Sequence, residues 1–150
     1  MTIFYQEIKK TEPALAEVDE SKTLEEKVKN AKVGDVIVLK NIYFKNRSPR
    51  IVPESKPTMY ELLCVLEDHP NLKIQIQGHI CCTPPYQKEA YDMDTMRREL
   101  SSNRAEAVYD YLVRKKIDPD RMTFKGYGNR KPLGKEPQYD RRVELVVNKV

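Results

Sequence analysis

The sequence lacks any long apolar run. No stretch approaches the roughly 20 consecutive apolar residues that a membrane-spanning helix needs. The opening MTIFYQEIKK also lacks the hydrophobic core of a secretion signal. We therefore expect a soluble chain with no membrane span and no targeting address of its own.

Residues that commonly carry catalysis are also scarce. The chain has two His, three Cys and five Gly, with no Gly-rich phosphate loop and no motif that supports a Ser-His-Asp triad or paired catalytic carboxylates. Three cysteines are too few for a disulfide scaffold and lack zinc-ribbon spacing. These absences argue against an enzyme, and we expect no catalytic residue, no cofactor and no metal site.

Charge is unevenly spread along the chain. The net charge is +4, and residues 97–150 hold 14 Lys and Arg against 8 Asp and Glu. The C-terminal part could attract an anionic partner, or it could simply present a solvated surface of mixed charge. Acids such as Glu99, Glu106 and Asp110 interrupt the basic series, so we expect no nucleic-acid partner.

Hydrophobic periodicity predicts one domain over residues 34–150, preceded by an N-terminal arm or linker over residues 1–33. The dense apolar stretch GDVIVLKNIYF predicts a strand buried largely on both sides. The element order β-α-β-α-β-β with short connections predicts an α+β, two-layer fold: a mixed sheet with both helices on one face. Strands are expected near 36–44, 72–80, 121–127 and 141–148, and helices near 57–68 and 96–116.

One charged residue breaks the apolar stripe of the second helix. In LSSNRAEAVYDYLV, Arg104 falls among the apolar positions when the stretch is wound as a helix. A buried guanidinium without a partner is costly, so something must answer its charge. The alternatives are a ligand carboxylate or an acid of this chain, of which Asp140 is one candidate.

From about residue 34 to its end, the chain resembles the OmpA-like C-terminal domain shared by outer-membrane proteins, peptidoglycan-associated lipoproteins and flagellar motor stators. The matching pieces are NIYFKNRSPRIVPES, LKIQIQGH, LSSNRAEAVYDYLVRKKIDPDRM, GYGNRKPL and DRRVELVV. The resemblance implies a non-catalytic periplasmic domain, associated with the outer membrane, that grips diaminopimelate in the peptide stem of peptidoglycan and tethers an outer-membrane protein to the cell wall.

The resemblance also implies a ligand site. Arg104 stands at the family arginine that binds the ligand carboxylate, a role that suits a planar guanidinium near the start of a helix. Asn46, His79, Asp140 and Arg142 lie in other matching pieces and are further candidates for ligand binding.

The chain departs from the family at several site positions. The usual Gly-His-Thr-Asp, whose aspartate receives the ligand ammonium, reads Gly-His-Ile-Cys here, with Cys81 in place of the acid. Arg97 and Asp140 replace family asparagines, and residues 81–96 include an insertion. Asp92 or Asp94 of this insertion could supply the missing acid; alternatively, Asp94 or Thr95 caps the following helix.

These departures leave a rival function open. The chain could be a degenerate OmpA-like scaffold that binds other envelope proteins and has lost its affinity for peptidoglycan. The loss of the aspartate and the presence of Arg97 favour this scaffold, whereas Arg104 and Arg142 favour wall binding.

The adjacent cysteines in GHICCTPP allow four interpretations. They could form a Cys-His nucleophile with His79, or a metal site completed by Cys64 or His69. They could also form a disulfide, either with each other or between one of them and Cys64. The simplest alternative is a pair of small, partly buried thiols.

Overall fold

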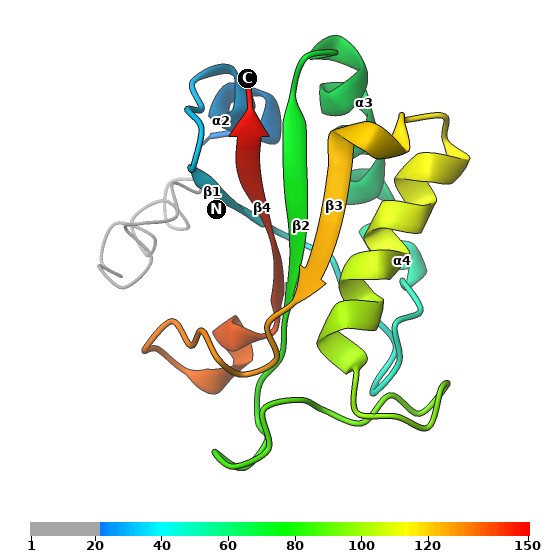
Figure 1. The fold of residues 1–150 in the computed structure, drawn as a ribbon, viewed down its shortest axis with the longest axis vertical. Coiled ribbons are helices and arrows are strands. Elements are labelled where there is room, and N and C mark those ends of the chain that lie inside the picture. Colours follow the sequence, from blue (N-terminus) through cyan, green and yellow to red (C-terminus); the bar gives the residue numbers. More distant parts are fainter. Residues whose placement is uncertain (1–21) are drawn as a thin grey trace, which may run out of the picture.

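The computed structural model describes residues 22–150 as four strands with helices around them (Figure 1). In chain order, the elements are α2 (Leu24–Lys29), β1 (Val36–Leu39), α3 (Lys56–Asp68), β2 (Lys73–His79), α4 (Leu100–Arg114), β3 (Met122–Gly126) and β4 (Arg142–Lys149). Short 3-10 helices precede α3, β3 and β4, at Pro53–Ser55, Pro119–Arg121 and Pro137–Asp140.

The strands form one mixed sheet in the order β1-β4-β2-β3. Strands β2 and β3 run parallel, and β4 runs antiparallel to both β1 and β2. In this register Ile76 of β2 stands between Phe124 of β3 and Leu145 of β4. The predicted β-α-β-α-β-β order and mixed sheet are confirmed.

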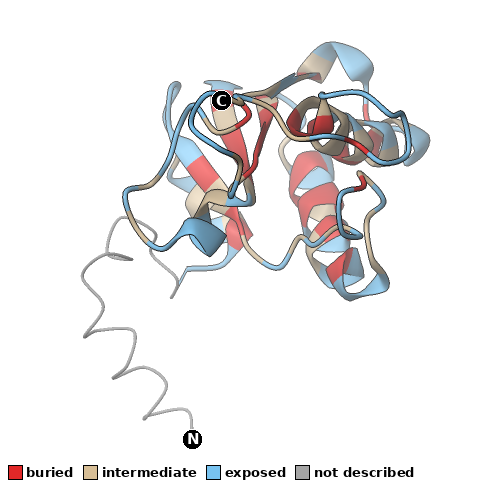
Figure 2. Ribbon diagram, turned by 90° about the horizontal axis from the view of Figure 1, so that it is seen from below, coloured by how far each residue is buried: buried red, intermediate tan, exposed pale blue. Residues whose placement is uncertain are grey.

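Both main helices cover the same face of the sheet (Figure 2). The inward side chains of β2 and β4 join the apolar faces of α3 and α4 in one cluster, and the members that are almost fully buried include Ile74, Ile76, Val143, Leu145, Leu62, Leu66, Val108 and Leu112. Burial of a full aliphatic side chain contributes about 1.5–3 kcal/mol. The helices are therefore held on the sheet by the periodic residues that predicted them.

The first strand is shorter and less buried than its composition predicts. It ends at Leu39, and Asn41 then adopts a φ of 60°, which turns the chain away from the sheet. Because β1 pairs only with β4, it is an edge strand, and Val36 remains 55% exposed. The prediction of a strand over 36–44 buried on both sides was wrong, and residues beyond Leu39 form a loop closed by a bridge between Phe44 and Ile51.

The second helix also begins later than predicted. It starts at Leu100 rather than near residue 96, because Met96 has a φ of 61° and Asp92 forms an antiparallel bridge with Arg97. Glu89 reaches the helix start from outside and accepts a hydrogen bond from Ser101 N at 2.9 Å. The cap comes from this glutamate and not from Asp94 or Thr95.

The N-terminal segment contributes to the core where the structure describes it. Thr23 caps α2 by accepting a hydrogen bond from Glu26 N at 3.2 Å, and Leu24 and Val28 belong to the buried cluster. Glu25 lies 2.8 Å from His69 Nε2 at the end of α3. Residues 1–21 of the expected arm lie outside the described residues.

Candidate functional site

A pocket of about 490 Å³ opens at the end of the sheet where β1 and β2 end and β4 begins. Four parts of the chain line it: the end of β1 with the segment that follows it, the segment before and at the start of β4, one residue of β2 and one residue of α4. Its lining residues are Leu39, Asn41, Ile42, Tyr43, Phe44, Asn46, His79, Arg104, Gln138, Arg141 and Arg142. Four of the predicted site residues, Asn46, His79, Arg104 and Arg142, therefore meet at one pocket.

Arg104 projects from α4 and is held by the loop after β1. Its Nε donates a hydrogen bond to Ser48 O at 3.0 Å, its Nη2 donates to Lys45 O at 3.4 Å, and its guanidinium carbon lies 5.0 Å from the centre of the Phe44 ring. These contacts fix the plane of the guanidinium but bring no negative charge.

Within residues 22–150, Arg104 forms no ion pair. Burial, followed by the nearby charge of Arg141, lowers the pKa of Arg104 to about 10, and Asp92 and Glu89 oppose this shift from a distance. The guanidinium is therefore still protonated at neutral pH. Its charge lies in a partly desolvated pocket without a matching carboxylate.

Asp140, the acid of this chain that was a candidate ion-pair partner for Arg104, has a different partner. Its Oδ1 accepts a hydrogen bond from Leu133 N at 2.9 Å, which stabilises the loop before β4. It does not line the pocket. The alternative of an Arg104–Asp140 pair is absent from the described structure.

His79 and Arg142 line the back of the pocket and form a buried charged cluster with Glu144. Arg142 Nε donates to Glu144 Oε2, while His79 Nε2 lies 3.3 Å from Glu144 Oε1, within ion-pair distance but without hydrogen-bond geometry. The His79 ring stacks on Tyr127 with 5.5 Å between the ring centres. The two other guanidinium nitrogens of Arg142 donate to the carbonyls of Asp140 and Lys131 at 3.2 and 3.0 Å.

This cluster keeps Glu144 ionised. Burial alone would raise the pKa of Glu144, but the contacts with His79 and Arg142 outweigh it and lower that pKa to about 2. The charge of Arg142 is thereby neutralised inside the protein. Arg142 consequently shapes the pocket wall, and the unneutralised charge belongs to Arg104 and Arg141.

The acids of the insertion hold the loop in place. Asp92 is fully buried; its Oδ1 accepts from Asp94 N and Thr95 N at 2.7 and 3.2 Å, and its Oδ2 accepts from Asn103 Nδ2 at 2.8 Å. Asp94 accepts from Ser48 Oγ at 2.8 Å and Arg50 Nε at 3.1 Å, and the Ser48 hydrogen bond lowers its pKa.

Asp92 and Asp94 of the insertion do not reach the pocket, and neither does the exposed Arg97 that follows the insertion. None of the three is among the lining residues. The insertion instead packs beside the loop that holds Arg104, with Met93 N donating to Arg47 O at 2.9 Å. The carboxylates of the insertion therefore anchor the Arg104 side of the site without entering it.

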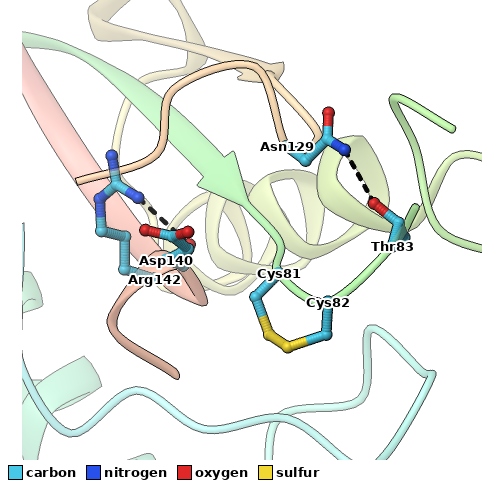
Figure 3. The surroundings of a disulfide bond; sticks show 6 residues. All are labelled: Cys81, Cys82, Thr83, Asn129, Asp140 and Arg142. Atoms are coloured by element: carbon cyan, nitrogen blue, oxygen red, sulfur yellow. Dashed lines mark hydrogen bonds between the residues drawn. A yellow bond between two sulfur atoms is a disulfide. The ribbon is translucent and has the colours of Figure 1, made fainter. Parts of the chain in front are cut away.

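The adjacent cysteines are joined to each other. Cys81 and Cys82 form a disulfide directly after β2, and Cys64 is free (Figure 3). Beside this disulfide, Asn129 Nδ2 donates to Thr83 Oγ1 at 2.9 Å. Among the alternatives, the structure therefore shows the adjacent disulfide, and Cys81 is not among the pocket-lining residues.

Two further features bear on the class of site. Among residues 22–150, no group of three or more His, Cys, Asp or Glu side chains is arranged to hold a metal ion. No helix in that same part of the chain is long and apolar enough to cross a membrane.

Several pocket residues were missed from the sequence. Tyr43, Phe44 and Gln138 line the pocket, and Arg141 supplies its second unneutralised charge. The Arg141-Arg142 pair and the aromatic pair Tyr43-Phe44 were the available signals. They could not show that both arginines line the pocket, because the course of the chain there depends on the unpredicted 3-10 helix Pro137–Asp140.

Several solved structures have a fold similar to that of this chain. The periplasmic domain of Helicobacter pylori MotB superposes with a TM-score of 0.63 at 19% identity, over 80% of this chain and 79% of that one. The peptidoglycan-associated lipoprotein of Burkholderia pseudomallei is 26% identical over 71% of this chain and 87% of its own, with a TM-score of 0.55. An outer membrane protein of Borrelia burgdorferi B31 is 27% identical over 77% and 98%, with a TM-score of 0.52.

Sequence comparison adds a curated relative and a family. The chain is 28% identical over 127 residues to the Photosystem I P700 chlorophyll a apoprotein A2 of Gloeobacter violaceus, a match that covers 76% of this chain but 14% of that protein. The model of the OmpA family matches residues 43–144, which include every lining residue of the pocket from Tyr43 onward. This chain therefore belongs to the OmpA family.

Proposed function

We propose that this chain is a non-catalytic envelope domain that binds the peptide stem of peptidoglycan, with a stem carboxylate on Arg104. The observation that carries the proposal is the fixed guanidinium of Arg104, which lines the pocket and has no ion-pair partner within residues 22–150. A planar guanidinium held by backbone carbonyls and an aromatic ring loses little freedom on meeting a carboxylate, and it can bind that group through two hydrogen bonds.

The names of similar proteins support the proposed location. Those proteins include a periplasmic domain, a peptidoglycan-associated lipoprotein and an outer membrane protein. By analogy, we place this domain in the periplasm, where it would tether an outer-membrane protein to the cell wall. The role requires binding alone.

A second candidate function is a scaffold that binds other envelope proteins. It is favoured by one observation: within residues 22–150, no Asp or Glu lines the pocket, so a zwitterionic amino acid would find a partner for its carboxylate but none for its ammonium. A domain that has lost its affinity for peptidoglycan could keep the fold and bind other proteins through its surface.

Sedimentation with insoluble peptidoglycan distinguishes the two functions. We expect the wild type to sediment, and Arg104→Ala and Arg104→Lys to lose at least nine-tenths of retention, because a lysine point charge cannot replace the planar fork. Arg114→Ala is the matched control, since Arg114 is an exposed arginine at the far end of α4. Thermal melts should show that Arg104→Ala stays folded, with a loss of about 1–2 kcal/mol from its two hydrogen bonds.

The outcomes separate cleanly. If the wild type does not sediment, the scaffold is favoured. If the wild type and both Arg104 variants sediment equally, the wall is bound elsewhere on the surface and the proposed site is wrong.

A further inference from the structure

The pocket carries positive charge that no described carboxylate neutralises. Arg104 and Arg141 line it, and neither forms an ion pair within residues 22–150. The two charges are close enough for Arg141 to lower the pKa of Arg104. Arg142 adds no unneutralised charge, because it forms an ion pair with Glu144.

The three acids that were candidates for the site already have other partners. Asp92 accepts three hydrogen bonds from the insertion and α4, Asp94 binds the loop at Ser48 and Arg50, and Asp140 holds the backbone at Leu133. To free one of them for a ligand ammonium would break the contacts that shape the site.

The uncharged walls suit a different ligand group. Asn46 and Gln138 bring side-chain amides to the pocket, and an amide carbonyl can accept a hydrogen bond from a ligand N–H without charge. Tyr43 and Phe44 add aromatic surface beside them. A neutral acylated nitrogen therefore meets neutral partners here, whereas an ammonium meets two guanidinium groups of like charge.

We propose that this pocket selects carboxylate ligands whose neighbouring amine is acylated, and disfavours the same ligands with a free ammonium. The inference rests on the proposed function, because it names the form of the stem peptide that the same site takes. In a cell wall, that form is a stem whose side-chain amine is already in an amide bond.

Calorimetric titration of the 150-residue chain tests this selectivity with two small probes. These are diaminopimelate and its N,N′-diacetyl derivative, which share the same two carboxylates. We expect the diacetyl form to bind at least tenfold more tightly, a difference of about 1.4 kcal/mol. Equal affinities, tighter binding of the free diamine, or no binding of either probe would overturn the inference.

A single isosteric change tests the electrostatic cause. Asn46→Asp adds a carboxylate to the pocket lining at nearly constant shape, and Asn46 is exposed, so the fold should be kept. We expect this variant to bind the free diamine about tenfold more tightly than the wild type does, and to bind the diacetyl form no better. An unchanged preference would mean that charge does not set the selectivity.

Sedimentation with peptidoglycan separates this inference from the proposed function. Wild-type protein that sediments but shows no preference for the diacetyl probe would overturn the selectivity and leave wall binding in place. Wild-type protein that neither sediments nor binds a probe would overturn both.

Discussion

At the scale of single residues, Glu144 is the charge on which the back wall of the pocket depends. It is 7% exposed and lies between Arg142 and His79, both of which line the pocket. Removal of one partner from a buried ionic cluster lowers stability by more than the pair contributes, because the other charge is left buried without a partner.

The Glu144 carboxylate should make stability depend on pH. Its folded pKa is about 2, below the ordinary value of 4.5, so its contribution is fully present above pH 4.5 and is lost as the pH falls towards 2. We expect Glu144→Gln to lower stability at pH 7 by about 3 kcal/mol. The variant should also flatten the loss of melting temperature between pH 4.5 and 2.

Thermal melts of both proteins across pH 2.5–7 measure this effect. If the wild type and Glu144→Gln lose stability in parallel on acidification, the cluster is not the source of the dependence.

Single residues also show how far the sequence alone could reach. The misplaced charge in an apolar stripe identified Arg104, because helical periodicity is local and reliable over a long helix. The partners of Arg104 were not foreseeable: they are the backbone carbonyls of Lys45 and Ser48, 59 and 56 residues away. Backbone groups carry no sequence signature, so only the fold could show what holds the guanidinium.

At the scale of elements, the close approach of α4 to the sheet depends on glycines. A Cβ added at Gly78 would lie 2.1 Å from Ser101 O, and one at Gly126 would lie 2.3 Å from Ser102 N. These paired residues of β2 and β3 let the first turn of α4 rest directly on the strands and bring Arg104 to the pocket. Glycine is required there by space, not by backbone conformation.

We expect Gly78→Ala to destabilise the protein by about 3 kcal/mol, since the backbone of α4 must move to admit the methyl group. Gly34→Ala is the control: Gly34 has a φ of 94° but nothing within 4 Å of an added Cβ, so it should lose only about 1 kcal/mol. Denaturant unfolding of both variants measures the two costs. Equal losses would mean that α4 is not confined by the sheet at Gly78.

Helices and strands were predicted best where buried apolar residues recur at a regular spacing. The central strands and α3 follow their periodic apolar residues closely, and the C-terminal strand places Val143, Leu145 and Val147 in the core as expected. Errors fell at β1 and at the start of α4, where Asn41 and Met96 adopt positive φ values. Asn adopts positive φ more often than most residue types, so Asn41 was a weak available signal, whereas Met96 gives none and its turn is imposed by tertiary contacts.

Contacts between residues far apart in the sequence also stabilise the end of α3, and the sequence did not predict them. Arg121, before β3, donates hydrogen bonds to the carbonyls of Leu66, His69 and Leu72 at 2.8, 2.7 and 3.1 Å. It thereby satisfies carbonyl groups at the end of α3 and in the turn that leads to β2. An arginine 49 residues or more from its partners gives no local signal of such a role.

At the scale of the whole molecule, the hydrophobic core and the pocket lie in different parts of the fold. The core lies between the sheet and the two long helices and includes Leu24 and Val28 of α2. The pocket lies at one end of the sheet, between the loop after β1 and the segment before β4, beside single residues of β2 and α4. Loops on a rigid scaffold can change their binding chemistry while the core is kept.

Binding of a stem carboxylate at Arg104 can be observed directly at that guanidinium by nuclear magnetic resonance. Its Nε–H donates to Ser48 O, which should slow proton exchange enough for a side-chain signal to be seen. On titration with a soluble peptidoglycan stem peptide, we expect a saturable shift of the Arg104 Nε–H signal, while the signal of Arg121, whose Nε–H donates to Leu72 O outside the pocket, stays in place. Binding of the peptide with no change in the Arg104 signal would show that the carboxylate binds elsewhere.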